Sequence, residues 1–252
     1  MAAALLVEQA GDTLRVTMAR PERRNAFDAE LIQELAEAFE DVGNVRAVVL
    51  AGEGESFCAG ADVDWMRASI ELSYEENVAD ARRLRKMLET IDSSPAPVIA
   101  RVQGHALGGG CGLIACSDVV VASRDAKFGF SEVKLGIIPS VISPFALAKI
   151  GSSAARRYFV TGERFDAATA LRIGLVHEVA DDLDEAVEQI LGELRTAGPE
   201  AARHAKQLVL DPPDGLGTER RIAERRTSEE GQEGLRAFLE KRDPAWRSES
   251  SS

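Results

Sequence analysis

The strongest constraint on the fold is a glycine-rich stretch at residues 104–118, GHALGGGCGLIACSD, which has three consecutive glycines and a further glycine at position 112. Because glycine has no Cβ, a ligand or a neighbouring segment can come close to the peptide N–H groups there. The preceding segment at residues 96–104, APVIARVQG, has the length and apolar character of a buried strand, and CGLIACS at residues 111–117 favours a helix. The stretch therefore predicts a strand that is joined to a helix by a glycine-rich loop whose peptide groups are not covered by side chains.

Strand and helix patterns alternate on both sides of this stretch. Strands are expected in a hairpin at residues 5–20 and at residues 45–52, 118–123 and 126–130, and helices at residues 29–39, after the N-cap Asp28, and 73–91. Beyond Pro144 the pattern is almost wholly helical, with helices expected at 144–151, 152–162, 166–174, 183–198, 199–210 and 218–242. The alternation predicts a parallel-sheet α/β core over residues 1–195 and a helical C-terminal region over residues 196–252.

Composition excludes several classes of function. The chain of 252 residues has a net charge of −12, so it offers no basic face to nucleic acid or anionic lipid. Its three cysteines, Cys58, Cys111 and Cys116, lack the paired spacing of a zinc site or a disulfide framework and are expected to be buried thiols. No window approaches the roughly 18 apolar residues of a membrane span, and the start lacks a basic leader, so a cytoplasmic protein without a metal is expected.

A second glycine-rich loop follows the strand at residues 45–52. Its sequence at residues 52–66 is GEGESFCAGADVDWM, in which Asp62 can cap the next helix. Ligands of α/β proteins bind at the carboxyl ends of parallel strands, where both glycine loops would lie. Two inward N–H groups facing each other would form an oxyanion hole, whereas the alternative is that the glycines serve only tight turns and close helix packing.

Several ordered motifs resemble the enoyl-CoA hydratase/isomerase, or crotonase, superfamily. They are RPERRNAFD at 20–28, SFCAGADV at 56–63, GHALGGGCGLIACSDVVVAS at 104–123, AKFGFSEVKLGIIP at 126–139 and AARRYFVTGERFDAATALRIGLVHEV at 154–179. The resemblance covers nearly the whole chain. It implies a spiral of ββα units, with C-terminal helices that assemble the protein as a homotrimer or homohexamer.

The resemblance also implies a site for a coenzyme A thioester, with no cofactor beyond the coenzyme A of the substrate. The thioester oxygen would lie between the N–H groups of Ala61 and Gly109, beside Gly108, and Glu132 would be the acid/base. Coenzyme A would contact Arg23, Arg24 and Phe27 and the backbone of the CAGAD segment, including Ala59 and Asp62. Phe238 and Lys241 would be added from a neighbouring subunit.

Gly112 stands where the well-known hydratases of this family carry a second catalytic glutamate. One carboxylate can suffice for a syn elimination, because the base that takes the α-proton can pass it to the departing hydroxyl on the same face. The absent side chain would leave room for a branched acyl group. The segment at residues 131–167, which begins SEVKLGIIPSVISPF, resembles bacterial 3-methylglutaconyl-CoA hydratases and related dehydratases, and Lys134 is then the candidate cation for a distal carboxylate if the strand continues past Glu132.

Other readings stay open at this stage. His105 could be a second acid/base or could simply pack, whereas Asp118, His177 in an expected strand and His204 on a helix are interpreted as structural. A double-bond isomerase of the same fold would also manage with Glu132 alone. A non-catalytic acyl-CoA-binding homologue is the third hypothesis, although it would be expected to lack Glu132 or one of the glycine loops.

Overall fold

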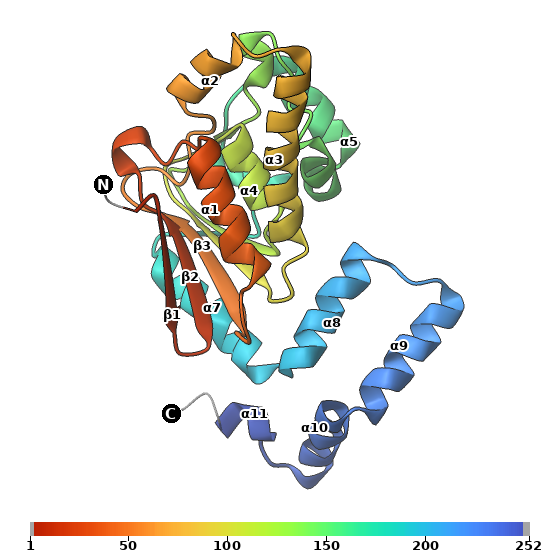
Figure 1. Ribbon diagram of the computed structural model, residues 1–252. Helices are drawn as coiled ribbons and strands as arrows, with labels where there is room; N and C mark the ends of the chain where they lie inside the picture. Colours follow the sequence, from red (N-terminus) through yellow and green to blue (C-terminus); the bar gives the residue numbers. More distant parts are fainter. Residues whose placement is uncertain (1–2, 249–252) are drawn as a thin grey trace.

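The computed structural model describes residues 3–248 and shows a mixed α/β body from which the C-terminal helices extend (Figure 1). The larger sheet has six strands in the order β1-β2-β3-β4-β6-β9. Its strands are β1 (Leu5–Ala10), β2 (Thr13–Met18), β3 (Ala47–Gly52), β4 (Val98–Val102), β6 (Val119–Ser123) and β9 (Glu178–Ala180). Only the β1–β2 hairpin is antiparallel, so the predicted parallel sheet is confirmed for the other pairings.

A smaller sheet carries the functional loops. It has the order β5-β7-β8, with β5 (His105–Leu107) parallel to β7 (Lys127–Gly129) and β8 (Phe165–Asp166) antiparallel to it. The sequence pattern did not predict β5 or β8, because strands of two or three residues are too short for an alternating pattern to be visible.

Helices cover both faces of the large sheet. Successive residues of a strand point to opposite faces, so Val48 and Leu50 of β3 join one core while Val49 joins the other. The larger core is covered by α1 (Ala29–Glu40), α3 (Tyr74–Asp92) and α4 (Gly109–Ala115), and the smaller by α7 (Leu183–Thr196). Each fully buried aliphatic side chain contributes about 1.5–3 kcal/mol to this packing.

The helix starts follow from local chemistry. The Asp28 side chain accepts a hydrogen bond from the Leu31 N–H at the start of α1, as predicted, and Ser73 and Glu76 form a reciprocal capping box on α3. The helices expected at 144–151 and 152–162 are both present. They lie within the segment labelled α5 (Ser143–Thr161) and are separated at Gly151, whose backbone is not helical and whose φ is +68°. Helix α6 (Ala167–Arg172) follows β8.

The C-terminal helices differ in one respect from the prediction. The single helix expected at 218–242 is divided at Ser228 into α9 (Gly215–Thr227) and α10 (Glu229–Glu240), because the extended backbone of Ser228 ends α9 and its side chain caps α10. Figure 1 shows α8 (Pro199–Leu210), α9 and α10 extending away from the body, and α11 (Ala245–Ser248) returning toward α7. An ion pair of 2.8 Å between Lys206 Nζ and Asp118 Oδ2 ties α8 to the body.

Two smaller expectations are also settled. All three cysteines are buried, as predicted. His177 lies just before β9 instead of inside a strand, and its Nδ1 accepts a hydrogen bond from the Val120 N–H.

Within residues 3–248, no helix is both long and apolar enough to cross a membrane, and no cluster of three or more His, Cys, Asp or Glu side chains could hold a metal ion.

Candidate active site

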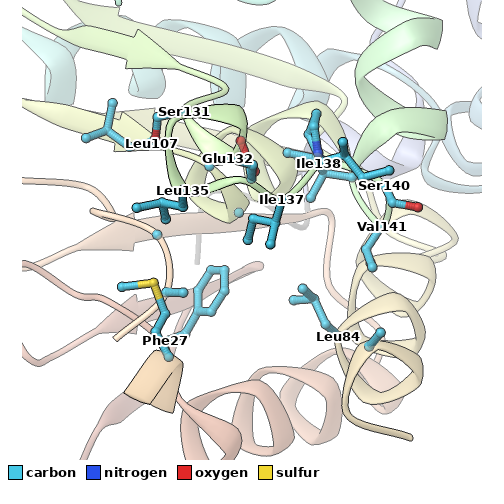
Figure 2. Close-up of a pocket in the computed structure, with 18 of the residues that line it drawn as sticks. Phe27, Leu84, Leu107, Ser131, Glu132, Leu135, Ile137, Ile138, Ser140 and Val141 are labelled. Atoms are coloured by element: carbon cyan, nitrogen blue, oxygen red, sulfur yellow. The ribbon is translucent and has the colours of Figure 1, made fainter. Parts of the chain in front are cut away.

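The site is a cavity of ≈ 440 Å³ at the carboxyl ends of the strands, where both glycine loops meet α3 and the segment after β7. Figure 2 shows Glu132 and Ile137 on one side of the cavity, with Phe27 and Leu84 on the opposite side. The lining also includes Trp65, Met66, Leu107, Leu135, Ile138, Val141 and Ile142, so most of the wall is apolar. Such a cavity suits an acyl chain and strengthens the electrostatic interactions of the few polar groups that face it.

Backbone hydrogen bonds hold the two glycine loops side by side. Cys58 N–H donates to the His105 carbonyl, and the Leu107 N–H donates back to the Cys58 carbonyl. Phe27 N–H donates to the Gly60 carbonyl. This pairing leaves the N–H groups of Ala61 and Gly109 without an acceptor among the described residues, and both residues line the cavity.

The three consecutive glycines are needed because each of them touches a different neighbour. A Cβ on Gly109 would lie 2.1 Å from Phe27 Cζ, and one on Gly110 would lie 2.5 Å from the Cys58 carbonyl oxygen. Gly108 has φ of +52°, which favours glycine, and its missing side chain would point at Glu132. The glycines therefore serve close packing, as one of the two readings expected, and Gly108 and Gly109 also line the cavity. Their part in an oxyanion hole stays a prediction.

Glu132 lies at the start of a 3₁₀ helix, η2 (Glu132–Leu135), directly after the β7 segment. Its Oε1 lies 3.3 Å from the position of a Cβ on Gly108, and its Oε2 is buried with no hydrogen-bond partner among the described residues. Burial raises the pKa of the Glu132 carboxyl above its ordinary value of 4.5, against a smaller lowering by a backbone hydrogen bond. A partly desolvated carboxyl without a partner beside free N–H groups is suited to accept and donate protons.

The raised pKa of Glu132 makes a prediction about stability. Between the ordinary pKa and the raised one, the folded state binds more protons than the unfolded state, so the free energy of unfolding falls as pH rises through this window. Glu132→Gln should therefore raise the melting temperature at neutral pH, and this gain should disappear below the ordinary value of 4.5. Thermal unfolding followed at several pH values checks this; a glutamine variant less stable than wild type at neutral pH would contradict it.

The interpretation of Gly112 as room for a branched acyl group is wrong. A Cβ on Gly112 would lie 2.6 Å from Ile142 Cγ2 and 3.6 Å from Leu88 Cδ1, and Gly112 does not line the cavity. Ile142 comes from the start of α5 and is buried, so the volume of the absent side chain is filled by this chain itself. The sequence could not show this, because residues 112 and 142 meet only in the folded state.

Lys134 does not face the cavity either. The strand β7 ends at Gly129, before Glu132, and the chain then turns into η2, so the expected alternation of side chains is lost. The Lys134 Cγ lies 3.2 Å from the position of a Cβ on Gly162, and Lys134 is not a lining residue. The cation that lines the described cavity is Arg164, whose Cγ packs over Gly129 and which has no ion-pair partner among the described residues.

The residues expected at the coenzyme A moiety surround the first glycine loop. Phe27 and Ala59 line the cavity, and the Ala59 N–H donates to the Arg24 carbonyl. Asp62 caps α2 (Val63–Ser69), as predicted, and its Oδ2 lies 2.8 Å from Arg23 Nη1. Hydrogen bonds from Arg23 and from backbone N–H groups outweigh burial and lower the pKa of the Asp62 carboxyl.

Arg23, Arg24 and Asp62 lie outside the cavity lining, so their contact with coenzyme A stays a prediction. Phe238 and Lys241 lie at the end of α10, far from the cavity of their own chain, and Phe238 is 81% exposed. His105 is not a lining residue, and its Nδ1 lies 3.4 Å from Ser56 Oγ.

Three further lining residues that matter were missed by the sequence reasoning. Asp80 and Leu84 of α3 lie one turn apart and face the cavity, and Ile142 fills the space beside Gly112. Asp80 and Leu84 could have been found from the sequence, because Asp80, Leu84 and Leu88 follow one another at intervals of four residues. This spacing places an aspartate on the apolar face of an amphipathic helix. A fourth missed lining residue, Arg164, directly precedes β8, a two-residue strand that no pattern marked.

Comparisons with known proteins agree with this geometry. The sequence model of the enoyl-CoA hydratase/isomerase family matches residues 8–249. A solved enoyl-CoA hydratase from Shewanella pealeana is 40% identical, with a TM-score of 0.91 over 97% of this chain and 96% of that chain. Pseudomonas aeruginosa AtuE is 38% identical, with a TM-score of 0.92 over 97% and 100%, and an enoyl-CoA hydratase of Mycobacterium smegmatis is 34% identical, with a TM-score of 0.91 over 97% and 99%.

These matches span the α/β body and the C-terminal helices alike, so the predicted crotonase-like fold is confirmed. The chain belongs to the enoyl-CoA hydratase/isomerase family.

Proposed function

We propose that this protein catalyses the reversible addition of water to a 2-enoyl-CoA thioester, with Glu132 as the single residue that carries protons. The observation that supports this most is the Glu132 carboxyl itself. Its Oε2 is buried and has no hydrogen-bond partner among the described residues, in the same cavity that Ala61 and Gly109 line with N–H groups lacking an acceptor there. The reaction needs no cofactor, because coenzyme A enters and leaves as part of the substrate.

The proposed chemistry is balanced within the cavity. The N–H groups of Ala61 and Gly109 stabilise the negative charge on the thioester oxygen as water adds to carbon 3. Glu132 takes a proton from the water and returns a proton to carbon 2 on the same face. The hydroxyl and the hydrogen are thus added together, and the carboxylate is regenerated.

The proposed substrate is a branched, glutaconyl-type enoyl-CoA. The apolar wall of Leu135, Ile137 and Ile138 suits a branched chain. The guanidinium of Arg164, which has no ion-pair partner within residues 3–248, is a candidate partner for a distal carboxylate. Arg164 takes the role that the sequence reasoning had given to Lys134. Glutaconyl-type thioesters should therefore react with a lower KM than straight-chain enoyl-CoA thioesters of equal length.

The test is to incubate the protein with enoyl- and 3-hydroxyacyl-CoA thioesters in heavy-oxygen water and to follow the products by mass. The proposal requires label at carbon 3 of the hydrate. Double-bond migration without uptake of oxygen would move the protein to the isomerases of the family. Binding of thioesters without any turnover would leave only an acyl-CoA-binding protein.

The assembly is predicted to be a homotrimer or homohexamer. Leu239 and Phe238 of α10 and Val209 of α8 are each more than three-quarters exposed, which is costly for a helical arm left in water. Leu239→Glu should dissociate the assembly, whereas Val7→Glu, at a half-exposed residue of the edge strand β1, should not. Light scattering checks both variants; a wild-type monomer at micromolar concentration would contradict the prediction.

A further inference from the structure

The cavity wall carries a second carboxylate that the proposed proton transfer does not use. Glu132 and Asp80 are the two acidic residues among the described lining residues. Asp80 comes from α3, the helix whose Leu84 lies across the cavity from Glu132 (Figure 2). The two carboxylates therefore reach the same cavity from elements on opposite walls.

The Asp80 side chain is held in place although it faces an apolar cavity. The residue is only 8% exposed, and its Oδ1 accepts a hydrogen bond of 2.6 Å from Arg83 Nη2. Its Oδ2 has no hydrogen-bond donor among the described residues. Arg83 gives the Asp80 carboxylate a counter-charge at Oδ1, which leaves Oδ2 as an acceptor without a donor among the described residues, on a side chain of a cavity-lining residue.

Its neighbours reinforce this acceptor. The Asn77 side-chain amide donates its N–H groups to the backbone carbonyls of Leu72 and Ser73, which turns it away from donating to the cavity. Ser69 Oγ likewise donates to the Met66 carbonyl. The polar corner formed by Ser69, Asn77 and Asp80 is therefore rich in acceptors, and it would take a ligand that brings its own hydrogens.

Hydration creates a need for such an acceptor. A water molecule that attacks carbon 3 can give one proton to Glu132, but its second hydrogen also needs a partner in a largely apolar cavity. Gly112 cannot supply one, because Ile142 and Leu88 occupy the space beside it. Asp80 is the remaining carboxylate on the described wall.

We infer that Asp80 holds the reacting water, or the 3-hydroxyl in the reverse direction, through a hydrogen bond to its Oδ2, while Glu132 moves the protons. This inference rests on the proposed hydratase function and adds a second residue to its mechanism. Asp80 only accepts a hydrogen bond and takes no part in the proton transfer. The hydroxyl still goes to carbon 3 and the hydrogen to carbon 2, so the balance of the reaction is unchanged.

The test compares Asp80→Asn with the matched variant Asp64→Asn, which changes an exposed aspartate of α2 that does not line the cavity. Asp80→Asn should lower kcat for hydration by roughly 10- to 100-fold, the worth of a hydrogen bond to a charged group, with a much smaller change in KM. Asp64→Asn should leave kcat unchanged. Exchange of the carbon 2 protons of butyryl-CoA in D₂O needs Glu132 and the oxyanion hole but no attacking water, so it should persist in Asp80→Asn within about threefold of wild type.

Several results would overturn the inference. Full hydratase activity of Asp80→Asn would show that the carboxylate does not hold the water. An equal loss of hydration, of proton exchange and of butyryl-CoA binding by calorimetry would show that Asp80 only supports the fold. A rise in KM alone would assign Asp80 to the acyl chain. A wild-type protein that hydrates no enoyl-CoA would instead refute the proposed function, which separates the two failures.

Discussion

Glu132→Gln is expected to lower the rate of hydration by roughly 10²- to 10⁴-fold, the usual worth of a positioned acid/base. The glutamine keeps the size of the side chain beside Gly108 but removes the group that takes and returns the proton. Thioester binding should persist, because the free N–H groups of Ala61 and Gly109 and the apolar wall are untouched. Steady-state kinetics and calorimetric titration with a saturated acyl-CoA measure the two effects separately.

Glu71→Gln, at an exposed glutamate outside the cavity, is the matched control and should behave as wild type. Substantial turnover in Glu132→Gln would refute the proton-transfer mechanism. Adding Gly112→Glu to this variant should not restore activity, because the new side chain would meet Ile142 at its first carbon. Overpacking and an unpaired buried charge should instead destabilise the protein, by about 1–3 kcal/mol or more.

Gly109→Pro is expected to reduce kcat by roughly 10²- to 10³-fold, the loss found when one oxyanion-hole donor is removed. Proline is tolerated at the first position of a helix, so α4 itself should still form. Its Cβ would nevertheless lie against Phe27, at 2.1 Å from Cζ before relaxation. The steric effect must therefore be measured separately from the loss of the N–H donor.

Gly109→Ala supplies that comparison, because it adds the same Cβ against Phe27 but keeps the N–H group. The proline variant should be slower than the alanine variant by roughly tenfold or more, and this ratio reports the donor itself. Circular dichroism and thermal unfolding show whether both variants fold. Equal activities of the two folded variants would mean that the Gly109 N–H does not bind the thioester oxygen.

Several features of the site could be predicted from the sequence because they depend on local chemistry. The Asp28 and Asp62 caps follow from side chains that satisfy nearby N–H groups. The glycines at 108–110 marked a place where backbone comes close to a neighbour, whatever that neighbour was. Motif order then singled out Glu132, which in the structure begins η2, shortly after β7, and lines the cavity.

Errors arose where a local pattern was extended past its range. Lys134 was assigned to the face of Glu132 on the assumption of a continuing strand, but Gly136, with φ of +75°, ends the 3₁₀ turn that replaces it. The helix expected at 218–242 was divided because Ser228 is a good N-cap, and this preference exceeded the amphipathic pattern around it.

By itself the sequence determined most of the longer helices and strands, the parallel sheet of the body and the residue types that carry the chemistry. These depend on periodicity, caps and glycines within a few residues of one another. Only the tertiary structure decided what meets what. Ile142 lies over Gly112, Arg164 and not Lys134 lines the cavity, and Asp80 of α3 lines the same cavity as Glu132. These contacts join residues 30 or more positions apart, or place one face of a helix against a loop, and packing in three dimensions fixes them while no local preference does.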